Sequence, residues 1–411
     1  MAEMVDTVVI GAGHVGLAIS CLLTRDGTDH IVLERGQVAQ RWRSERWDSL
    51  VFQFPNWSLQ LPDYAYGGAD PDGYASKAEF IQFLEEYAAT IRAPLRCNTE
   101  VHAVRDVGNG RFLDVETSRG TVRATNVVVA TGSFHTPKIP QFSENLPPDI
   151  YQIHARDYRN PAQLPDGNVV VVGSGASGCQ IAEELHRDNR KVFLAVGRFN
   201  RTPRRYRGRD FYWWFDKLGY WHTPLASMPA DARSLRFVVT AVDGGHDVDP
   251  HQYAIDGIVL AGHLKSAERH KLTFHDDLDA TLDAADAWYE KFRKQMDECA
   301  ASIDPPLPKE PTAPDASIVR GVKGIVELDL REQNVRSVIW ATGYALDFSW
   351  IKLSVFADNG DPKHERGVTQ RAGLYFLGLR RTYSIGSALV AGAELDAAYI
   401  ANHIAATRKP K

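Results

Sequence analysis

Two segments of the chain show the same succession of apolar, glycine-rich and helical patterns. Residues 6–10 and 168–172 are short apolar runs rich in valine and isoleucine, which is typical of buried parallel strands. Each run is followed by closely spaced glycines and then by apolar residues at helical spacing. A second apolar run follows each helix, at 30–33 and 191–196. The pattern predicts two βαβ units and an α/β fold with two doubly wound sheets.

The segments around these units have patterns of their own. Other expected helices and strands lie at 78–90, 112–117, 121–129, 284–300 and, starting at Ser387, 387–406. Five prolines between residues 304 and 314 predict a connector that crosses between domains. We therefore divide the chain into a first nucleotide domain at 1–165, a second with an aromatic-rich insertion at 166–315, and a return to the first at 316–411.

Composition narrows the class of protein. The chain has 411 residues, of which 44% are hydrophobic, enough for two domains with sizeable cores. Its net charge of −5 offers no basic field for nucleic acid. Four scattered cysteines without a C-x-x-C pair argue against a disulfide framework, a zinc site or a dithiol relay, so we expect no metal. No apolar run is long enough for a membrane span, and the early first strand leaves no room for a secretory signal, so we expect a cytoplasmic protein.

The first glycine motif has the spacing G-x-G-x-x-G. Gly11 permits the tight turn, Gly13 permits the close approach of a pyrophosphate, and Gly16 permits close packing of helix on strand. Glu34 follows at the end of the next strand, where a carboxylate accepts hydrogen bonds from ribose hydroxyls and repels a 2′-phosphate. The motif therefore predicts FAD or NAD rather than NADP. The expected contact residues are Gly11, Gly13, His14, Val15, Gly16 and Glu34.

The second glycine motif repeats the spacing without the acid. No acidic residue stands at the comparable point, residues 196–198, and several arginines follow. A guanidinium group matches a phosphate in charge and geometry. We therefore predict NADPH here, with Arg198 as the main partner of the 2′-phosphate and Arg204, Arg205 and Arg207 as helpers; a solvated basic loop is the alternative. The expected pyrophosphate contacts are Gly173, Ser174, Gly175, Ala176, Ser177 and Gly178.

Several ordered motifs extend this picture over nearly the whole chain. They are Arg41-Trp42-Arg43, Trp47-Asp48-Ser49-Leu50, Leu61-Pro62, Val128-Val129-Ala130-Thr131-Gly132 and Ile339-Trp340-Ala341-Thr342-Gly343-Tyr344. In these motifs the chain resembles the flavin-containing monooxygenase family, and it is most similar to the bacterial and YUCCA-type members of the class B flavoprotein monooxygenases. The resemblance implies two Rossmann-like domains, the NADPH domain inserted into the FAD domain, and FAD and NADPH as cofactors.

The resemblance also implies further contacts with the cofactors. The Trp-Arg segment is similar to a pair that contacts FAD, the two A-T-G segments are similar to segments that link the nucleotide domains, and the last helix is similar to one that points its N-terminus at the flavin. The residues so implied are Arg35, Arg41, Trp42, Arg43, Val101, Ala130, Thr131, Gly132, Ala341, Thr342, Gly343, Ser387 and Gly392. A plain buried helix is the alternative for the last two residues.

One signature of the family is only half present. The signature has the form F-x-G-x-x-x-H-x-x-x-Y/F, and His154 and Tyr158 match its second half. Pro148 and Ile150 stand where the first half needs phenylalanine and glycine. By resemblance, Tyr158 favours heteroatom or YUCCA-like chemistry over Baeyer–Villiger chemistry. For His154 we expect a structural or gating role at the domain junction rather than acid–base catalysis.

The activity that the resemblance implies is an NADPH-consuming, FAD-dependent monooxygenase. In such an enzyme NADPH reduces the flavin, dioxygen forms a flavin hydroperoxide, and one oxygen atom passes to a nitrogen or sulfur atom, a heteroaromatic ring or a carbonyl of a small substrate. Gln53, Asn56 and Gln60 lie in the stretch that resembles the flavin lining and are the candidate catalytic amides; surface turn residues are the alternative. The aromatic block 211–221 is expected to be core packing, with a substrate channel or a subunit contact as alternatives.

Two other functions are compatible with the two glycine motifs. A pyridine-nucleotide:acceptor oxidoreductase would use the same hydride transfer and then pass electrons to a protein or quinone without oxygen transfer. A nucleotide sensor would bind FAD and NADP without turnover. The expected partners are a small-molecule substrate and dioxygen, without nucleic acid or membrane, and a homodimer is the default assembly.

Overall fold

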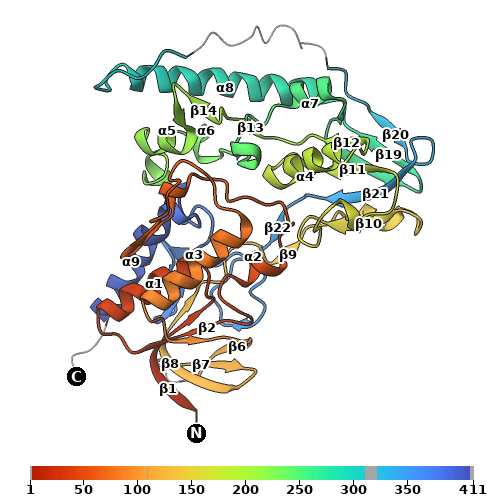
Figure 1. Ribbon diagram of the computed structural model, residues 1–411. Coiled ribbons are helices and arrows are strands. Elements are labelled where there is room, and N and C mark those ends of the chain that lie inside the picture. The colour runs from red at the N-terminus through yellow and green to blue at the C-terminus, as the bar shows by residue number, and fades with distance from the viewer. Residues whose placement is uncertain (1, 109, 311–321, 408–411) are drawn as a thin grey trace.

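The chain forms two lobes, each built around a sheet (Figure 1). The computed structural model describes residues 2–108, 110–310 and 322–407. The N-terminal segment and the C-terminal helix lie together in one lobe, called here the first lobe, and the middle of the chain forms the second lobe. The predicted α/β fold with two sheets of nucleotide-binding type is therefore confirmed.

The sheet of the first lobe has a parallel centre. Its ten strands are β1 (Glu3–Ile10), β2 (His30–Leu33), β5 (Leu95–Arg96), β6 (Val101–Asp106), β7 (Leu113–Thr117), β8 (Gly120–Val129), β23 (Ile351–Lys352), β24 (His364–Glu365), β25 (Val368–Thr369) and β26 (Leu374–Phe376). Strand β1 lies between β2 and β8 and is parallel to both, and β26 joins the far side of β8, also parallel. Val8 and Val9 are fully buried because both faces of this centre are covered.

Three long helices pack together on the first lobe. They are α1 (His14–Arg25), α3 (Lys77–Thr90) and α9 (Val390–Thr407), and residues of all three share one core cluster. Helix α3 begins with a capping box, because the Ser76 hydroxyl accepts the Glu79 N–H at 3.2 Å and the Glu79 carboxylate accepts the Ser76 N–H at 2.7 Å. Helix α9 starts at Val390, three residues later than predicted, because Ala388 has a left-handed backbone with φ of 72°.

The sheet of the second lobe is parallel throughout. Its order is β10 (Tyr151–His154), β21 (Val335–Trp340), β11 (Asn168–Val172), β12 (Val192–Ala195) and β17 (Val259–Ala261). One face packs against α4 (Ala176–Arg187), α7 (Pro250–Asp256) and the start of α8 (Leu278–Ala300). The other face is covered by the antiparallel strands β18 (Leu264–Glu268), β19 (Lys271–Phe274) and β20 (Glu327–Asp329).

The strand order favours domain boundaries that differ from the expected ones. Strand β10 lies before residue 166 and β21 lies after residue 315, yet both pair within the second sheet. We therefore propose crossings near residues 150 and 341 rather than at 165 and 316. Beyond them, β9 (Thr136–Pro137) and β22 (Tyr344–Ala345) pair with each other, so the two crossing segments run side by side. The predicted proline connector lies within the described residues only as far as residue 310.

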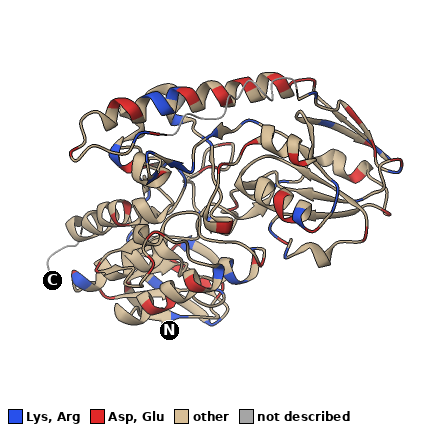
Figure 2. Cartoon of the chain, turned by 45° about the horizontal axis from the view of Figure 1, so that its top comes forward, with Lys and Arg blue, Asp and Glu red and all other residues tan. Residues whose placement is uncertain are grey.

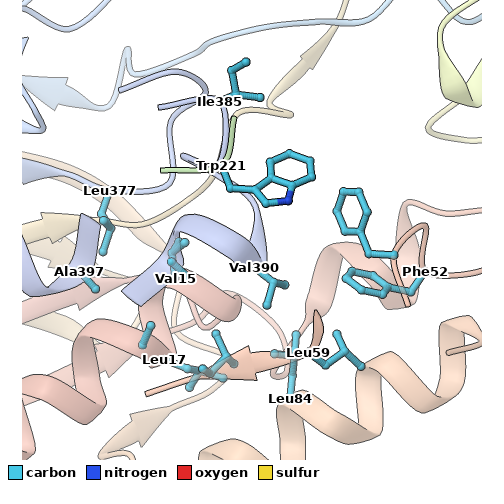
Figure 3. Packing of buried hydrophobic residues seen from close by; sticks show 14 of the residues in the cluster. Val15, Leu17, Phe52, Leu59, Leu84, Trp221, Leu377, Ile385, Val390 and Ala397 are labelled. Carbon is cyan, nitrogen blue, oxygen red and sulfur yellow. The ribbon is translucent and has the colours of Figure 1, made fainter. Parts of the chain in front are cut away.

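The aromatic block lies in a core cluster that contains residues of both lobes. Helix α5 (Phe211–Lys217) and Trp221 follow β12 in sequence, but they share a cluster with first-lobe residues (Figure 3). The ring of Phe54 lies 5.2 Å from that of Tyr212 and 5.9 Å from that of Trp221, and Trp221 is fully buried. Phe292 on α8 belongs to the same cluster. Packing is therefore the role that the structure gives to the buried members of this block.

Charges are distributed over both lobes, with acidic and basic side chains interspersed (Figure 2). Within the described ranges, no helix combines the length and apolarity that a membrane crossing requires. The same residues contain no cluster of three histidine, cysteine or acidic side chains able to hold a metal ion.

Candidate functional site

The first glycine motif forms a turn that only glycine can close. Gly11 has φ of +111°, and a Cβ there would lie 2.6 Å from the carbonyl oxygen of Ala130. A Cβ on Gly16 would lie 1.9 Å from the carbonyl oxygen of Gly11. Gly13, at the N-cap of α1, has nothing within 4 Å of its Cβ position. The strand and helix thus meet at Gly11 and Gly16, and Gly13 leaves room for a pyrophosphate at the helix N-terminus.

The second glycine motif repeats this geometry closely. Gly173 has φ of +108° and its Cβ position lies 2.6 Å from the carbonyl oxygen of Ala341, while that of Gly178 lies 1.8 Å from the carbonyl oxygen of Gly173. Gly175 again has nothing within 4 Å. Ser174 fixes the neighbouring strand end, because its hydroxyl donates to Gly197 O and accepts from Gly197 N, both at 2.9 Å. Both motifs therefore fit a dinucleotide.

Each A-T-G segment supports one of the two motifs. The N–H of Ala130 donates to Ile10 O at 2.8 Å, and the N–H of Ala341 donates to Val172 O at 2.9 Å. The two alanines thus occupy equivalent places beside Gly11 and beside Gly173. The resemblance implies that these segments link the domains and contact the cofactors, and it does not predict this support of the glycine turns. One feature of the sequence indicates this place: each A-T-G segment directly follows the apolar run of a strand, as each glycine motif does.

The remaining A-T-G residues hold the crossing between the lobes. Thr131 lies 3.2 Å from the His135 ring, Gly132 has φ of +74°, and Thr342 donates to Lys138 O. Gly343 O accepts from the Lys138 N–H at 2.9 Å.

The carboxylate of Glu34 is placed as the first motif requires. It is buried at the end of β2, and its two oxygens accept the N–H groups of Ala12 at 2.9 Å and Gly36 at 3.0 Å. A carboxylate has about four acceptor positions, so two remain for ribose hydroxyls. Its charge disfavours a 2′-phosphate. Val101, in β6, is two residues beyond Thr99, whose N–H donates to Glu34 O at 2.8 Å.

The segment after Glu34 is held by contacts within the protein. Arg35 and Arg41 donate to the two oxygens of Glu45, at 2.6 and 2.7 Å, and Arg43 donates to Val38 O at 2.9 Å. The Trp42 ring packs 4.3 Å from that of Phe80. These bonds fix the short helix α2 (Gln40–Ser44) beside the first motif. The expected contacts of these residues with FAD stay predictions.

The loop before α9 lies against the first motif. His14 Nε2 lies 3.2 Å from the carbonyl oxygen of Ala388 and donates to it, and burial lowers the pKa of His14 to about 4. The Ser387 hydroxyl accepts the N–H groups of Tyr383 and Ser384, both at 3.1 Å. A Cβ on Gly392 would lie 2.5 Å from the backbone of Gly386. The structure thus brings Ala388, the neighbour of Ser387, to the nucleotide motif at the start of the chain, and the expected contacts of Ser387 and Gly392 with FAD stay predictions.

The two signature residues occupy structural positions. His154 Nε2 donates to Gly343 O at 3.1 Å and its Nδ1 accepts the Arg156 N–H at 3.1 Å, so both ring nitrogens serve the junction. Burial lowers the pKa of His154, which keeps the ring neutral. Tyr158 is fully buried and donates to Glu184 at 2.6 Å. The geometry agrees with a structural role for His154.

The three candidate amides are in different environments. Asn56 is buried, its Nδ2 donates to Asp70 O at 2.9 Å, and its Oδ1 has no partner among the described residues. Gln53 is half-buried, and its backbone oxygen accepts from Arg204 at 2.7 Å. Gln60 is exposed and donates to Trp57 O at 3.0 Å, which corresponds to the surface-turn alternative. Asn56 is therefore the strongest of the three.

Arg204 and Arg205 do not join Arg198 at the second motif. Arg204 is 1% exposed, pairs with Asp210 at 2.7 Å and is stacked between the rings of Tyr74 and Phe211, at 4.4 and 5.1 Å. Because Arg204 is buried in the core, its role is structural. A run of arginines in the sequence does not indicate which of them is buried. Arg205 lines an open pocket of about 410 Å³ with several acidic residues. The helper Arg207 pairs with Asp297 at 2.7 Å, so the expectation for the helpers is corrected.

Several cationic and aromatic side chains, which the sequence does not predict to meet, lie together at the crossing between the lobes. The guanidinium groups of Arg46 and Arg380 lie 5.2 and 4.7 Å from the centre of the Phe134 ring. Tyr344 packs against Phe134 at 5.0 Å and against His154 at 5.0 Å. Residues so far apart in the chain carry no local signal that they meet.

Comparisons with known proteins agree with this geometry. The profile of the pyridine nucleotide-disulphide oxidoreductase family matches residues 8–208. An uncharacterised CzcO-like oxidoreductase of Geobacillus kaustophilus is 35% identical over 98% of this chain and 99% of its own, and the probable indole-3-pyruvate monooxygenase YUCCA3 of Arabidopsis thaliana is 29% identical over 97% and 86%.

Solved structures share the fold. A flavin-containing monooxygenase from Stenotrophomonas maltophilia superposes with a TM-score of 0.69 at 18% identity, covering 98% of this chain and 99% of its own. A complex of OTEMO with FAD and NADP superposes with a TM-score of 0.56 at 16% identity, covering 99% and 86%.

Proposed function

This chain belongs to the flavin monooxygenase family, a family of oxidoreductases that use FAD and NADPH, and we propose that it transfers one oxygen atom of dioxygen to a small organic substrate. The observation that carries the proposal is the pair of unequal motifs. Each motif leaves space at its central glycine. The carboxylate of Glu34 lies beside the first motif, whereas the arginine Arg198 lies beside the second. FAD fits the first motif and NADPH fits the second.

The chain's own residues have distinct tasks in this proposal. The N-terminus of α1 at Gly13 and the N-terminus of α4 at Gly175 offer N–H groups to the two pyrophosphates. Glu34 accepts ribose hydroxyls, and neutral His14 holds the 383–388 loop against the first motif. Bound FAD supplies the redox chemistry, taking hydride from NADPH and activating dioxygen.

The state of the cysteines favours oxygen transfer over electron delivery through thiols. All four cysteines are free, and Cys21 and Cys179 are buried. Burial raises the pKa of the Cys179 thiol, so no reactive dithiol stands ready for a reductase. The buried amide of Asn56, whose Oδ1 has no partner within the described part of the chain, is a group that can orient a substrate or the nicotinamide amide.

The substrate class that we propose is a compound oxidised at nitrogen, sulfur, a heteroaromatic ring or a carbonyl. Similar proteins include a probable indole-3-pyruvate monooxygenase of Arabidopsis thaliana and an S-allyl-L-cysteine S-oxygenase from Allium sativum, which represent two of these chemistries. The half-present signature around His154 does not decide between them.

The test is an oxygen balance on the FAD-loaded protein. NADPH oxidation, dioxygen uptake, hydrogen peroxide and ¹⁸O in the product are measured with an amine, a sulfide, a heteroaromatic compound, a ketone and an α-keto acid. Incorporation of one ¹⁸O atom per NADPH with at least one compound supports the proposal. Rapid electron transfer to quinones or ferricyanide without labelled product from any class would favour the acceptor oxidoreductase, and an unreduced flavin would favour the sensor.

A further inference from the structure

Residues 44–50, called here the interlobe segment, are bonded to both lobes. The segment begins at the end of α2, beside the first glycine motif, yet Trp47 and Leu50 are buried in the core cluster of the second lobe. The carbonyl oxygen of Leu50 accepts the N–H of Lys77, at the start of the first-lobe helix α3, at 3.1 Å. The segment therefore joins the core of one lobe to a helix of the other.

The carboxylate of Asp48 lies at the middle of this contact. One of its oxygens accepts from Lys77 Nζ of the first lobe at 3.0 Å, and the other accepts from Asn160 Nδ2 of the second lobe at 2.8 Å. The N–H of Asp48 donates to Arg159 O at 2.8 Å, and the Arg159 guanidinium donates to Ser44 O. Residues 159 and 160 thus hold the interlobe segment at two points.

A second carboxylate, that of Glu184, is shared between the interlobe segment and the second lobe. Glu184 is half-buried on α4. Its Oε1 accepts the Ser49 hydroxyl and its Oε2 accepts the hydroxyl of the fully buried Tyr158, both at 2.6 Å. Burial raises the pKa of Tyr158, so this hydroxyl stays a donor. Tyr158 holds one oxygen of Glu184, and the other oxygen is turned to Ser49.

These bonds connect the two glycine motifs to each other. Directly before α2, the N–H of Ala39 donates to the carbonyl oxygen of Ala12 in the first motif at 3.2 Å. At the other end of the connection, Glu184 belongs to α4, whose N-cap is Gly175 of the second motif. Because α4 is one rigid helix, a bond at Glu184 constrains the place of its N-terminus.

The relation between the lobes matters for hydride transfer. Reacting atoms must approach to about 3–3.5 Å, and a misplacement of about 1 Å can cost roughly 100-fold in rate. In the proposed function each motif holds one of the two cofactors, so the contacts between the lobes set the distance between nicotinamide and flavin. The aromatic insertion supplies apolar packing, which has no preferred direction, whereas the interlobe segment supplies directional hydrogen bonds.

We propose that Glu184 is a positioning residue for hydride transfer, which acts through its bond with Ser49 to place the NADPH-binding helix α4 relative to the flavin. The nature of the reaction rests on the proposed function. The effect of Glu184 on the cofactors passes through α4 and the interlobe segment. Tyr158, the last residue of the half-present signature, keeps the Glu184 carboxylate turned for this bond.

The test is anaerobic flavin reduction in the FAD-loaded enzyme, followed at increasing NADPH concentration. Ser49→Ala and Glu184→Ala should each lower the limiting rate of reduction roughly tenfold, because the geometry of transfer is loosened. The dissociation constant for NADPH should stay within about twofold, because the pyrophosphate site at Gly175 is intact. Ser49→Thr, which keeps the hydroxyl, should recover the rate. The control is Glu327→Gln, a carboxylate paired with Lys271 within the second lobe, which should change neither value.

A double variant tests the pairing itself. Ser49→Ala with Glu184→Ala should be no slower than Glu184→Ala alone, because both changes remove the same bond. Ser49→Ala leaves the Tyr158–Glu184 bond in place, so it remains informative if Glu184→Ala folds poorly. Additive losses of rate, or a parental limiting rate in Ser49→Ala, overturn the proposal.

Amide exchange separates this proposal from the proposed function. The bond from Asp48 N–H to Arg159 O crosses the contact, and its exchange is measured on the FAD-loaded enzyme without NADPH. Ser49→Ala should accelerate deuterium uptake in the peptide that contains residues 44–50, and Glu327→Gln should not. If uptake is faster but NADPH does not reduce even the parent flavin, the contact stands and the proposed function fails. Slower reduction without faster uptake overturns the positioning role of Glu184.

Discussion

Replacing Gly16 and Gly13 by alanine in turn separates folding from nucleotide binding at the first motif. A Cβ on Gly16 would lie 1.9 Å from the carbonyl oxygen of Gly11, whereas a Cβ on Gly13 meets nothing within 4 Å. The clash partner at Gly16 is backbone, so no change of rotamer relieves it. To restore even 3.0 Å, α1 and the end of β1 must separate by 3.0 − 1.9 = 1.1 Å.

The magnitudes follow from these contacts. Overpacking of this kind costs roughly 1–3 kcal/mol, and a backbone shift of this size belongs at the upper end of that range. Alanine returns roughly 0.5–1 kcal/mol of helix propensity inside α1. The net loss for Gly16→Ala is therefore about 2 kcal/mol. Gly13 has φ of −85°, which alanine adopts freely, so Gly13→Ala should lose less than about 1 kcal/mol as an N-cap change.

The assay uses the FAD-free proteins and then adds FAD. Urea unfolding of the free proteins measures the stability difference, and flavin titration measures binding. Gly13→Ala should unfold almost as the parent does but bind FAD at least about 100-fold more weakly, because the methyl group occupies the space left for the pyrophosphate. The reasoning is refuted if Gly13→Ala binds FAD normally, or if the two variants lose equal stability.

Three further predictions concern Gly175, Arg204 and His14. Gly175→Ala should keep FAD and lose NADPH, and spectral titration that shows both nucleotides bound would contradict the equivalence of the two motifs. Arg204→Met should cost about 3–5 kcal/mol in urea unfolding because Asp210 is left buried without a partner, and Arg204→Met with Asp210→Leu should recover most of it. The folded-state pKa of His14, about 4, lies below the pKa of the same side chain in the unfolded protein. The contribution of neutral His14 to the free energy of unfolding is therefore complete above pH 6.5 and is lost as the pH falls towards 4. That contribution is about 3 kcal/mol, and His14→Gln should flatten the stability profile of the FAD-free protein in this window.

Local patterns predicted the parts of the molecule that local physics decides. The two strand–glycine–helix units and the acid at Glu34 depend on a few neighbouring residues, and the structure has them where the sequence placed them. The domain boundaries depend on which distant strands become neighbours. Strand β10 joins the second sheet through β21, nearly 200 residues further along the chain, and nothing in either segment encodes the pairing.

The arginines show the same limit at the site. The cluster of arginines in the sequence predicts that Arg204 and Arg205 assist Arg198, yet the fold buries Arg204 between two aromatic rings. Whether an arginine pairs with a ligand or with a core aspartate depends on its exposure. Exposure is a property of the packed molecule, so the composition of a loop does not determine it.

The insertion gives the two nucleotide sites a fixed relation to each other. Trp214 and Trp221 lie in the insertion that follows β12 of the second sheet. Both are completely buried, in a cluster that also contains first-lobe residues. The Trp221 ring lies 5.9 Å from the ring of Phe54 in the first lobe and 4.9 Å from the rings of Tyr212 and Phe215 in the insertion. Rotating the lobes apart would separate Trp221 from Phe54 and break the bonds that Trp221 O accepts from Ser384 and Gly386. A large domain rotation is therefore opposed by the core itself.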